Sequence, residues 1–100
     1  MDTSTSVALI ISTYNWPQAL KQTLRSVANQ TIPPNEVLIA DDGSDERTAN
    51  LIKQFILNNP TLNIKHVWHE DDGFRLAAIR NKAIRMAQSD YIIQIDGDIF

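Results

Sequence analysis

Two carboxylates stand on either side of a glycine in Asp96-Gly97-Asp98, directly after an apolar segment near the end of the chain. Side chains at this spacing across a turn can both point toward one hard cation. Mg²⁺ and Mn²⁺ take carboxylate oxygens together with phosphate oxygens and water. A solvated turn is the alternative interpretation, because so short a motif is common. The position of the motif at the end of a predicted buried strand favours the metal site.

A second acidic turn, Asp41-Asp42-Gly43-Ser44, follows another apolar segment. A carboxylate at a strand end can accept hydrogen bonds from N–H or hydroxyl groups of a ligand. The plainer interpretation is a turn followed by a helix cap. Thr13-Tyr14-Asn15 follows the first apolar segment and adds an aromatic ring and polar groups, although plain packing of Tyr14 stays open.

Basic residues gather near the last predicted helix, where four of the nine occur: Arg75, Arg80, Lys82 and Arg85. Arg75 and Arg80 are five positions apart, about 140° around a helix, so they do not share a helical face. At most one or two of these bases can therefore reach a phosphate. His66 and His69, three positions apart, are interpreted as loop histidines, with a His/Asp metal site as the alternative.

Buried strands are predicted wherever the chain has a short, continuous apolar segment rich in β-branched residues. Such segments occupy residues 7–11, 37–40 and 91–95, and a weaker one occupies residues 63–68. Each strand ends at a polar or acidic turn. The candidate ligand-binding residues therefore follow strands.

Three helices are predicted between the strands, because apolar residues recur at helical spacing over 20–28, 51–56 and 76–87. Asn15 and Ser44 are the expected N-caps of the first two helices. The resulting order, βαβαβαβ, implies right-handed crossovers and a mainly parallel sheet with helices on both faces. We therefore predict a three-layer, Rossmann-like α/β fold.

In such sheets ligands bind beyond the carboxyl ends of the strands, where loops and helix N-termini converge. Nine of the twelve acidic residues and all three glycines fall in the loops predicted there. We therefore expect an acidic ligand site at this edge. A nucleotide diphosphate would need a divalent cation and an arginine to bind beside so many carboxylates.

Composition excludes several classes of function. One hundred residues allow one domain, and 9 Lys+Arg against 12 Asp+Glu give a formal net charge of −3. That balance gives no reason to expect nucleic-acid binding. The chain has no cysteine, which excludes disulfides and thiolate zinc sites. No segment has the roughly 18 apolar residues of a membrane span, so a cytoplasmic location is expected, peripheral at the inner face of the membrane in a longer protein.

The chain stops two apolar residues after Asp98, and a four-stranded sheet is small for this fold. We therefore expect residues 1–100 to be a single N-terminal part of a larger domain, truncated after the fourth strand. Apolar surface and an open sheet edge would then be exposed, which predicts a homodimer.

Four segments together resemble the inverting family 2 glycosyltransferases, which have the GT-A fold. Val7–Asn15 (VALIISTYN) is similar to the family's first strand and Thr-Tyr-Asn turn, and Val37–Ser44 (VLIADDGS) to its second strand and Asp-Asp-Gly-Ser loop. Gly73–Ile84 (GFRLAAIRNKAI) is similar to its Ala-Ala-Arg-Asn helix, and Asp90–Asp98 (DYIIQIDGD) ends in its Asp-x-Asp metal motif. Residues 69–81 look most like bacterial polysaccharide and lipopolysaccharide transferases.

The resemblance implies roles for matching positions on the nucleotide side of a site. Tyr14 and Asp42 would contact the nucleobase, usually uracil, while Thr13 and Asp41 would support the turn. Arg80 is a further candidate for the nucleotide side. The implied donor is a nucleotide-diphosphate sugar, with a UDP-sugar expected.

The resemblance also implies a metal-dependent transfer reaction. Asp96 would lie near the ribose and the metal, and Asp98 would coordinate Mn²⁺ or Mg²⁺ bridging the diphosphate. A hydroxyl of a saccharide or lipid-linked acceptor would attack the anomeric carbon with inversion while the metal stabilises the leaving diphosphate. The family's general base lies downstream of the Asp-x-Asp motif, so the catalytic base is expected beyond Phe100. We expect little or no transferase activity from the chain alone.

Other classes fit the sequence less well. A nucleotidyltransferase needs a Gly-rich, basic phosphate loop after the first strand, where this chain has Ser12–Asn15. A phospho-receiver domain carries its acidic pair after the first strand, whereas Asp41 and Asp42 follow the second. A dinucleotide-binding domain needs G-x-G-x-x-G after the first strand, and the chain lacks it. A non-catalytic nucleotide-binding fragment remains the alternative.

Overall fold

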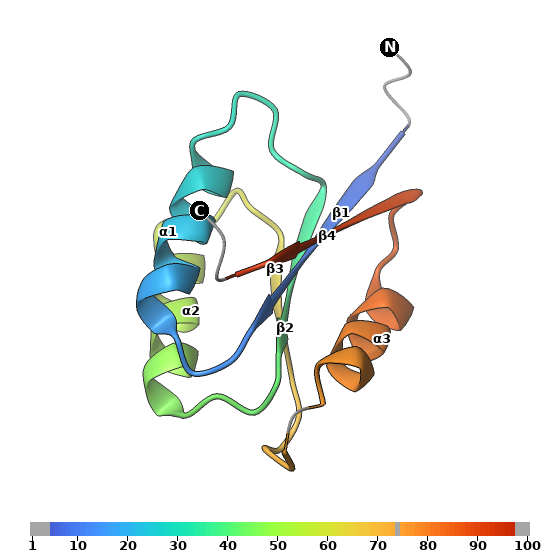
Figure 1. Ribbon diagram of the computed structural model, residues 1–100. Coiled ribbons are helices and arrows are strands. Elements are labelled where there is room, and N and C mark those ends of the chain that lie inside the picture. The colour runs from blue at the N-terminus through green and yellow to red at the C-terminus, as the bar shows by residue number, and fades with distance from the viewer. Residues whose placement is uncertain (1–4, 74, 98–100) are drawn as a thin grey trace.

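The computed structural model describes residues 5–73 and 75–97, which form a four-stranded sheet between two layers of helices (Figure 1). The strands are β1 (Val7–Thr13), β2 (Glu36–Asp41), β3 (Ile64–Trp68) and β4 (Tyr91–Asp96). They lie in the order β3-β2-β1-β4, and each neighbouring pair is parallel. The predicted α/β fold with a parallel sheet is confirmed.

The helices cover opposite faces of the sheet. Helices α1 (Pro17–Ala28) and α2 (Glu46–Asn58) pack on one face, and α3 (Leu76–Met86) packs on the other (Figure 1). The chain first moves from β1 outward through β2 to β3, and then crosses back to place β4 on the far side of β1. Because right-handed crossovers in opposite directions put their helices on opposite faces, this reversal produces the three layers.

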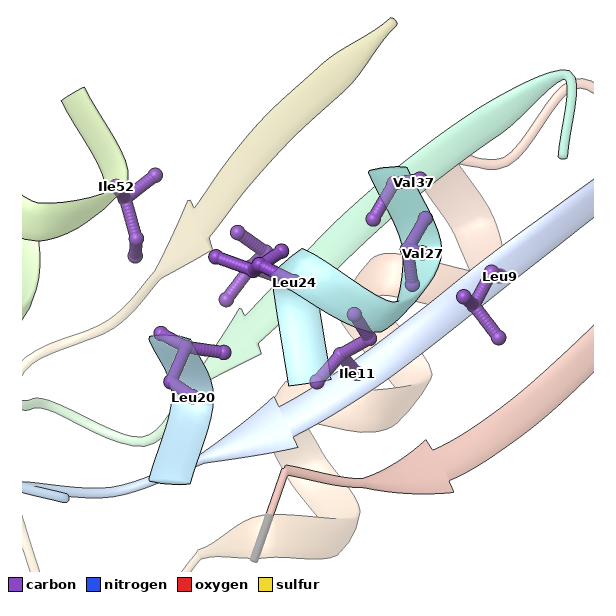
Figure 2. Close-up of a cluster of buried hydrophobic side chains, with 8 residues drawn as sticks. Leu9, Ile11, Leu20, Leu24, Val27, Val37 and Ile52 are labelled. Carbon is purple, nitrogen blue, oxygen red and sulfur yellow. The ribbon is translucent and has the colours of Figure 1, made fainter. Parts of the chain in front are cut away.

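Two apolar cores follow from the alternation of side chains along the strands. Leu9 and Ile11 of β1 belong to the core under α1 and α2, whereas Ala8 and Ile10 belong to the core under α3. Figure 2 shows Leu9 and Ile11 in the first core together with apolar side chains of both helices. A strand buried on both faces reads as a continuous apolar segment, which is why β1 was recognisable from sequence.

The predicted helix caps are wrong at both positions. Helix α1 begins after Trp16, and no side chain caps it. Asn15, at φ +43°, instead bridges two loops: its N–H donates to Ser44 Oγ (2.8 Å), and its Oδ1 accepts from the Asp45 N–H (2.8 Å). The N-cap of α2 is Asp45, whose carboxylate accepts the N–H of Arg47. Asn15 and Ser44 therefore join the turns after β1 and β2 instead of capping helices.

Strand β4 pairs with β1 alone among the described residues, so its other edge is open. Its apolar side chains are also exposed, with Tyr91 63%, Ile92 40% and Ile93 51% accessible. A groove of about 590 Å³ beside it is lined by residues that include Ile93 and Val27. The expected exposed apolar surface is therefore present. Within residues 5–73 and 75–97, no helix combines the length and apolar character needed to cross a membrane.

Candidate functional site

The carboxyl ends of the strands converge at one edge of the sheet and bring together residues that are far apart in sequence. Thr13 lies beside Asp41, and Asp96 lies beside Ser12, in neighbouring parallel strands. Tyr14 and Asp42 directly follow these positions. The structure thus places the predicted nucleotide-binding residues of all three turns at the same edge, next to the β1–β4 position where the strand order reverses. Open α/β sheets bind ligands at such switch points.

Asp41 is fully buried and holds its own turn in shape. Its Oδ1 accepts the N–H of Ser44 at 2.9 Å, and its Oδ2 contacts Nε2 of His66 at 2.8 Å. A buried carboxylate needs such donors because it has lost its water. Both oxygens are engaged inside the protein, so Asp41 supports the turn.

Asp42 is held in the same manner by different partners. Its Oδ1 contacts Nε2 of His69 at 2.5 Å, and its Oδ2 accepts the backbone N–H of Arg75 at 2.9 Å. The side chain of Asp42 is 2% exposed and that of His69 is 15% exposed. The loop between β3 and α3 therefore closes over the turn after β2, and its donors fix the carboxylate.

Sequence reasoning singled out the two histidines but missed their contacts with the aspartates. His66 lies within β3, inside the strand predicted over residues 63–68, and His69 lies in the loop after that strand. No group of three or more potential metal-ligating side chains exists among the described residues, so the alternative of a His/Asp metal site finds no support there. The sequence did contain one signal for these contacts. The two histidines lie near the end of β3, and the neighbouring strand β2 ends at Asp41 and Asp42.

Gly43 lets this loop approach the β2 turn closely. Its φ is +83°, a conformation that glycine adopts without strain, and a Cβ at this position would lie 2.4 Å from the backbone nitrogen of Asp71. The indole N–H of Trp68 donates to the carbonyl of Ser44 at 3.2 Å and further joins the two segments. The β2 turn and the β3–α3 loop therefore act as one packed unit.

Tyr14 lies on the exposed side of this unit, with 45% of the residue accessible. Its hydroxyl donates to Oδ2 of Asp71 at 2.9 Å. That hydrogen bond and the negative charge of Asp71 raise the pKa of Tyr14 above its ordinary value, and the charge of Asp42 adds to the effect. The exposed ring is available for stacking against a planar ligand.

The turn after β4 is anchored to β1 and α1. The N–H of Gly97 donates to the carbonyl of Ser12 at 2.7 Å, and the carbonyl of Gly97 accepts the hydroxyl of Thr23 at 3.2 Å. A Cβ at Gly97 would lie 2.7 Å from the Ser12 carbonyl, so the position requires glycine. Asp96 ends β4 at the same edge, whereas Asp98 lies outside the described residues. The oxygen donors of this acidic turn suit Mg²⁺ or Mn²⁺ chemically.

Arg80 is the base of α3 that reaches this edge. Its guanidinium donates to the hydroxyl of Ser12 at 3.2 Å, and Ser12 is the neighbour of Asp96 across the β1–β4 pair. Arg75 contributes its backbone N–H to Asp42, and Lys82 donates to the carbonyl of Trp68 at 3.2 Å. The expectation that at most one or two of the four bases reach a phosphate stays a prediction.

Three of the acids at this edge have partners within the protein. Asp41 and Asp42 each contact an imidazole, and Asp45 forms an exposed ion pair with Arg47 at 3.0 Å. That ion pair and hydrogen bond hold the pKa of Asp45 below its ordinary value. Asp41, Asp42 and Asp45 are therefore already engaged by partners within the protein.

Solved structures with the same arrangement identify the fold type. The mannosyltransferase PcManGT from Pyrobaculum calidifontis, in complex with GDP-Man and Mn²⁺, matches with a TM-score of 0.83 and 25% identity over 97% of this chain and 28% of that chain. TarS 1–349 of S. aureus, in complex with UDP-GlcNAc, matches with a TM-score of 0.81 and 27% identity over 94% of this chain and 27% of that chain. The fold is the GT-A glycosyltransferase fold, as the motifs predict.

Residues 8–100 match the sequence profile of glycosyl transferase family 2, and the chain belongs to that family. The chondroitin synthase of Escherichia coli is 38% identical over 94 residues, which are 93% of this chain and 13% of the synthase. The chain therefore spans a small fraction of the relatives that it matches. Family membership favours glycosyl transfer over the nucleotidyltransferase and phospho-receiver alternatives.

Proposed function

We propose that the chain forms the donor-nucleotide-binding part of an inverting glycosyltransferase. The observation that carries this proposal is the convergence of Tyr14, Asp42 and Asp96 at the switch-point edge of a GT-A sheet. These are the positions at which the family's nucleotide-binding motifs occur in the sequence. Two structures with this fold contain GDP-Man and UDP-GlcNAc, which supports a nucleotide-sugar donor.

In this proposal the nucleobase lies against the ring of Tyr14, and its imide N–H donates to Asp42. Uracil offers a suitable donor at N3, so a UDP-sugar is the proposed donor. Thr13 and Asp41 support the two turns. Arg80 compensates part of the negative charge of the diphosphate, because its guanidinium already lies at the β1–β4 edge.

A divalent cation, Mn²⁺ or Mg²⁺, is proposed at Asp98 with Asp96. When bound, it would stabilise the charge that develops on the departing nucleoside diphosphate. Asp96 contributes a carboxylate at the end of β4, and the N–H of the next residue, Gly97, donates to the carbonyl of Ser12. The proposed metal site is thus supported by the anchored turn after β4 and by the preference of these cations for carboxylate oxygens.

We further propose an acceptor hydroxyl on a saccharide or lipid-linked glycan, a role in cell-surface polysaccharide synthesis, and a location in the cytoplasm or at the inner face of the membrane. The relation to the chondroitin synthase supports the polysaccharide role. The open edge of β4 and its exposed apolar side chains support pairing of two copies, since unpaired strand edges and apolar patches promote association.

Calorimetric titration of the chain with UDP in the presence of Mn²⁺ tests the proposal. Asp42→Asn exchanges a carboxylate acceptor for an amide and should weaken UDP binding about 10- to 100-fold, as expected for loss of one charge-assisted hydrogen bond. Asp72→Asn is the matched control, since Asp72 is an exposed acid of the adjacent loop. Equal affinities of the two variants, or a parent chain that binds no nucleotide, would refute the proposed function.

A further inference from the structure

The contact between His69 and Asp42 has a consequence for ligand selection. Both carboxylate oxygens of Asp42 are engaged, one by Nε2 of His69 and one by the backbone N–H of Arg75. The side chain is almost completely buried. A carboxylate with a donor on each oxygen cannot rotate, so the lone pairs that remain have fixed directions.

Burial makes these donors decisive for the direction of the Asp42 carboxylate. A carboxylate that has lost its water depends on the protein for the hydrogen bonds that it accepts. The backbone donor of Arg75 restrains one oxygen, and only the imidazole restrains the other. Because Nε2 carries a proton both in the imidazolium and in one neutral tautomer, His69 can remain a donor in either charge state.

We propose that His69 is a positioning residue that determines which nucleobases the site accepts. It holds Asp42 as an acceptor of fixed direction. Bases that present an N–H donor at the centre of the Watson–Crick edge, uracil and guanine, can pair with such an acceptor. Cytosine and adenine present a lone pair there and would oppose the carboxylate. This inference rests on the proposed function and adds the residue that sets its selectivity.

Loss of the His69 donor should reduce the discrimination between nucleobases more than it reduces nucleotide binding in general. Without that donor the carboxylate can turn, so its lone pairs no longer meet the N–H of uracil or guanine in a fixed direction. A site that pairs a ligand N–H rejects analogues lacking it because buried polar groups are left unpaired. The positioning role therefore predicts a change in the ratio of the affinities for UDP and CDP, or for GDP and ADP.

The experiment measures dissociation constants of UDP, CDP, GDP and ADP in Mn²⁺ for the parent chain and three variants. His69→Phe keeps a ring without a donor, and His69→Gln keeps an N–H near the place of Nε2. Gln54→Ala is the control, since Gln54 is an exposed residue of α2. We expect the parent chain to prefer UDP over CDP, or GDP over ADP, by at least about 10-fold. His69→Phe should reduce that preference to less than about 3-fold, while His69→Gln and Gln54→Ala keep it.

The outcomes separate this inference from the function on which it rests. A parent chain that binds none of the four nucleotides refutes the proposed function, and the inference falls with it. A parent chain that binds without preference, or a His69→Phe variant that keeps the full preference, overturns the inference alone. Thermal unfolding shows whether each variant folds. If His69→Phe does not fold, His69→Ala replaces it and is judged by the same ratio.

Discussion

Substitution of Gly43 by alanine should break the packing between the β2 turn and the β3–α3 loop. The new methyl group would lie 2.4 Å from the backbone nitrogen and 2.5 Å from the Cα of Asp71. These are backbone atoms, so the loop itself must move. Its movement would pull on the contacts of His69 with Asp42 and of Tyr14 with Asp71.

The expected decrease in the unfolding free energy of Gly43→Ala has two parts. A left-handed backbone costs an alanine about 1–2 kcal/mol, and the overpacked contact costs about 1–3 kcal/mol more. Gly73 isolates the first part, since its φ is +75° and an added Cβ would meet nothing within 4 Å. Alanine also reduces the freedom of the unfolded chain, but this effect is the same at both glycines and cancels in the comparison.

Urea denaturation of Gly43→Ala and Gly73→Ala measures the difference between the two glycines. We expect Gly43→Ala to be less stable than Gly73→Ala by about 1–3 kcal/mol, or by roughly 4–24 °C in Tm for a domain of this size. UDP affinity should also fall in Gly43→Ala and stay near the parent value in Gly73→Ala. Equal unfolding free energies for the two variants would refute the packing of the loop on the turn.

Three further predictions concern ionisation and association. Asp71→Asn should return the raised pKa of Tyr14 toward its ordinary value, and ultraviolet titration in a Tyr91→Phe background measures that pKa. In the parent chain the hydrogen bond between Tyr14 and Asp71 stabilises the fold at lower pH, and this contribution is lost as pH rises through the raised pKa. Burial raises the pKa of Glu36, but hydrogen bonds from Ser89 and Gln88 and the Lys65 charge outweigh burial and lower it. Glu36→Gln should therefore cost about 1–3 kcal/mol at neutral pH, and urea denaturation should show that the difference from the parent chain shrinks as pH falls through the lowered pKa. Ile93→Lys should shift any dimer seen by light scattering toward monomer, and an unchanged dimer would exclude the β4 surface.

The sequence predicted β1 and β2 because their burial on two faces removes all alternation, whereas β4, predicted as a buried strand, is exposed over most of its length. Val37 to Ala40 in β2 shows this plainly, since every one of these side chains is buried. The helix starts were less predictable. Asn15 and Ser44 are favourable cap residues, but a contact between the β1 and β2 turns uses their polar groups. That contact links positions about thirty residues apart and depends on the assembled sheet.

The side chains that contact Asp41 and Asp42 in the candidate site also depend on the tertiary structure. His66 pairs with Ile39 across the β2–β3 pair, so its side chain shares a face with Asp41 two positions further along. Local sequence carries no information on which strand lies next to β3. The acidic turns were therefore predictable as turns, whereas the imidazole side chains that contact their carboxylates were not.

The most direct test of the central claim is the metal dependence of UDP binding. Calorimetry would compare the parent chain in Mn²⁺ and in EDTA with Asp98→Asn in Mn²⁺, and Asp90→Asn at the opposite edge of the sheet serves as control. We predict that EDTA and Asp98→Asn each weaken UDP binding by at least about 10-fold, while Asp90→Asn matches the parent chain. Equal affinity with and without Mn²⁺ would contradict a metal-assisted nucleotide site at the Asp96–Asp98 turn.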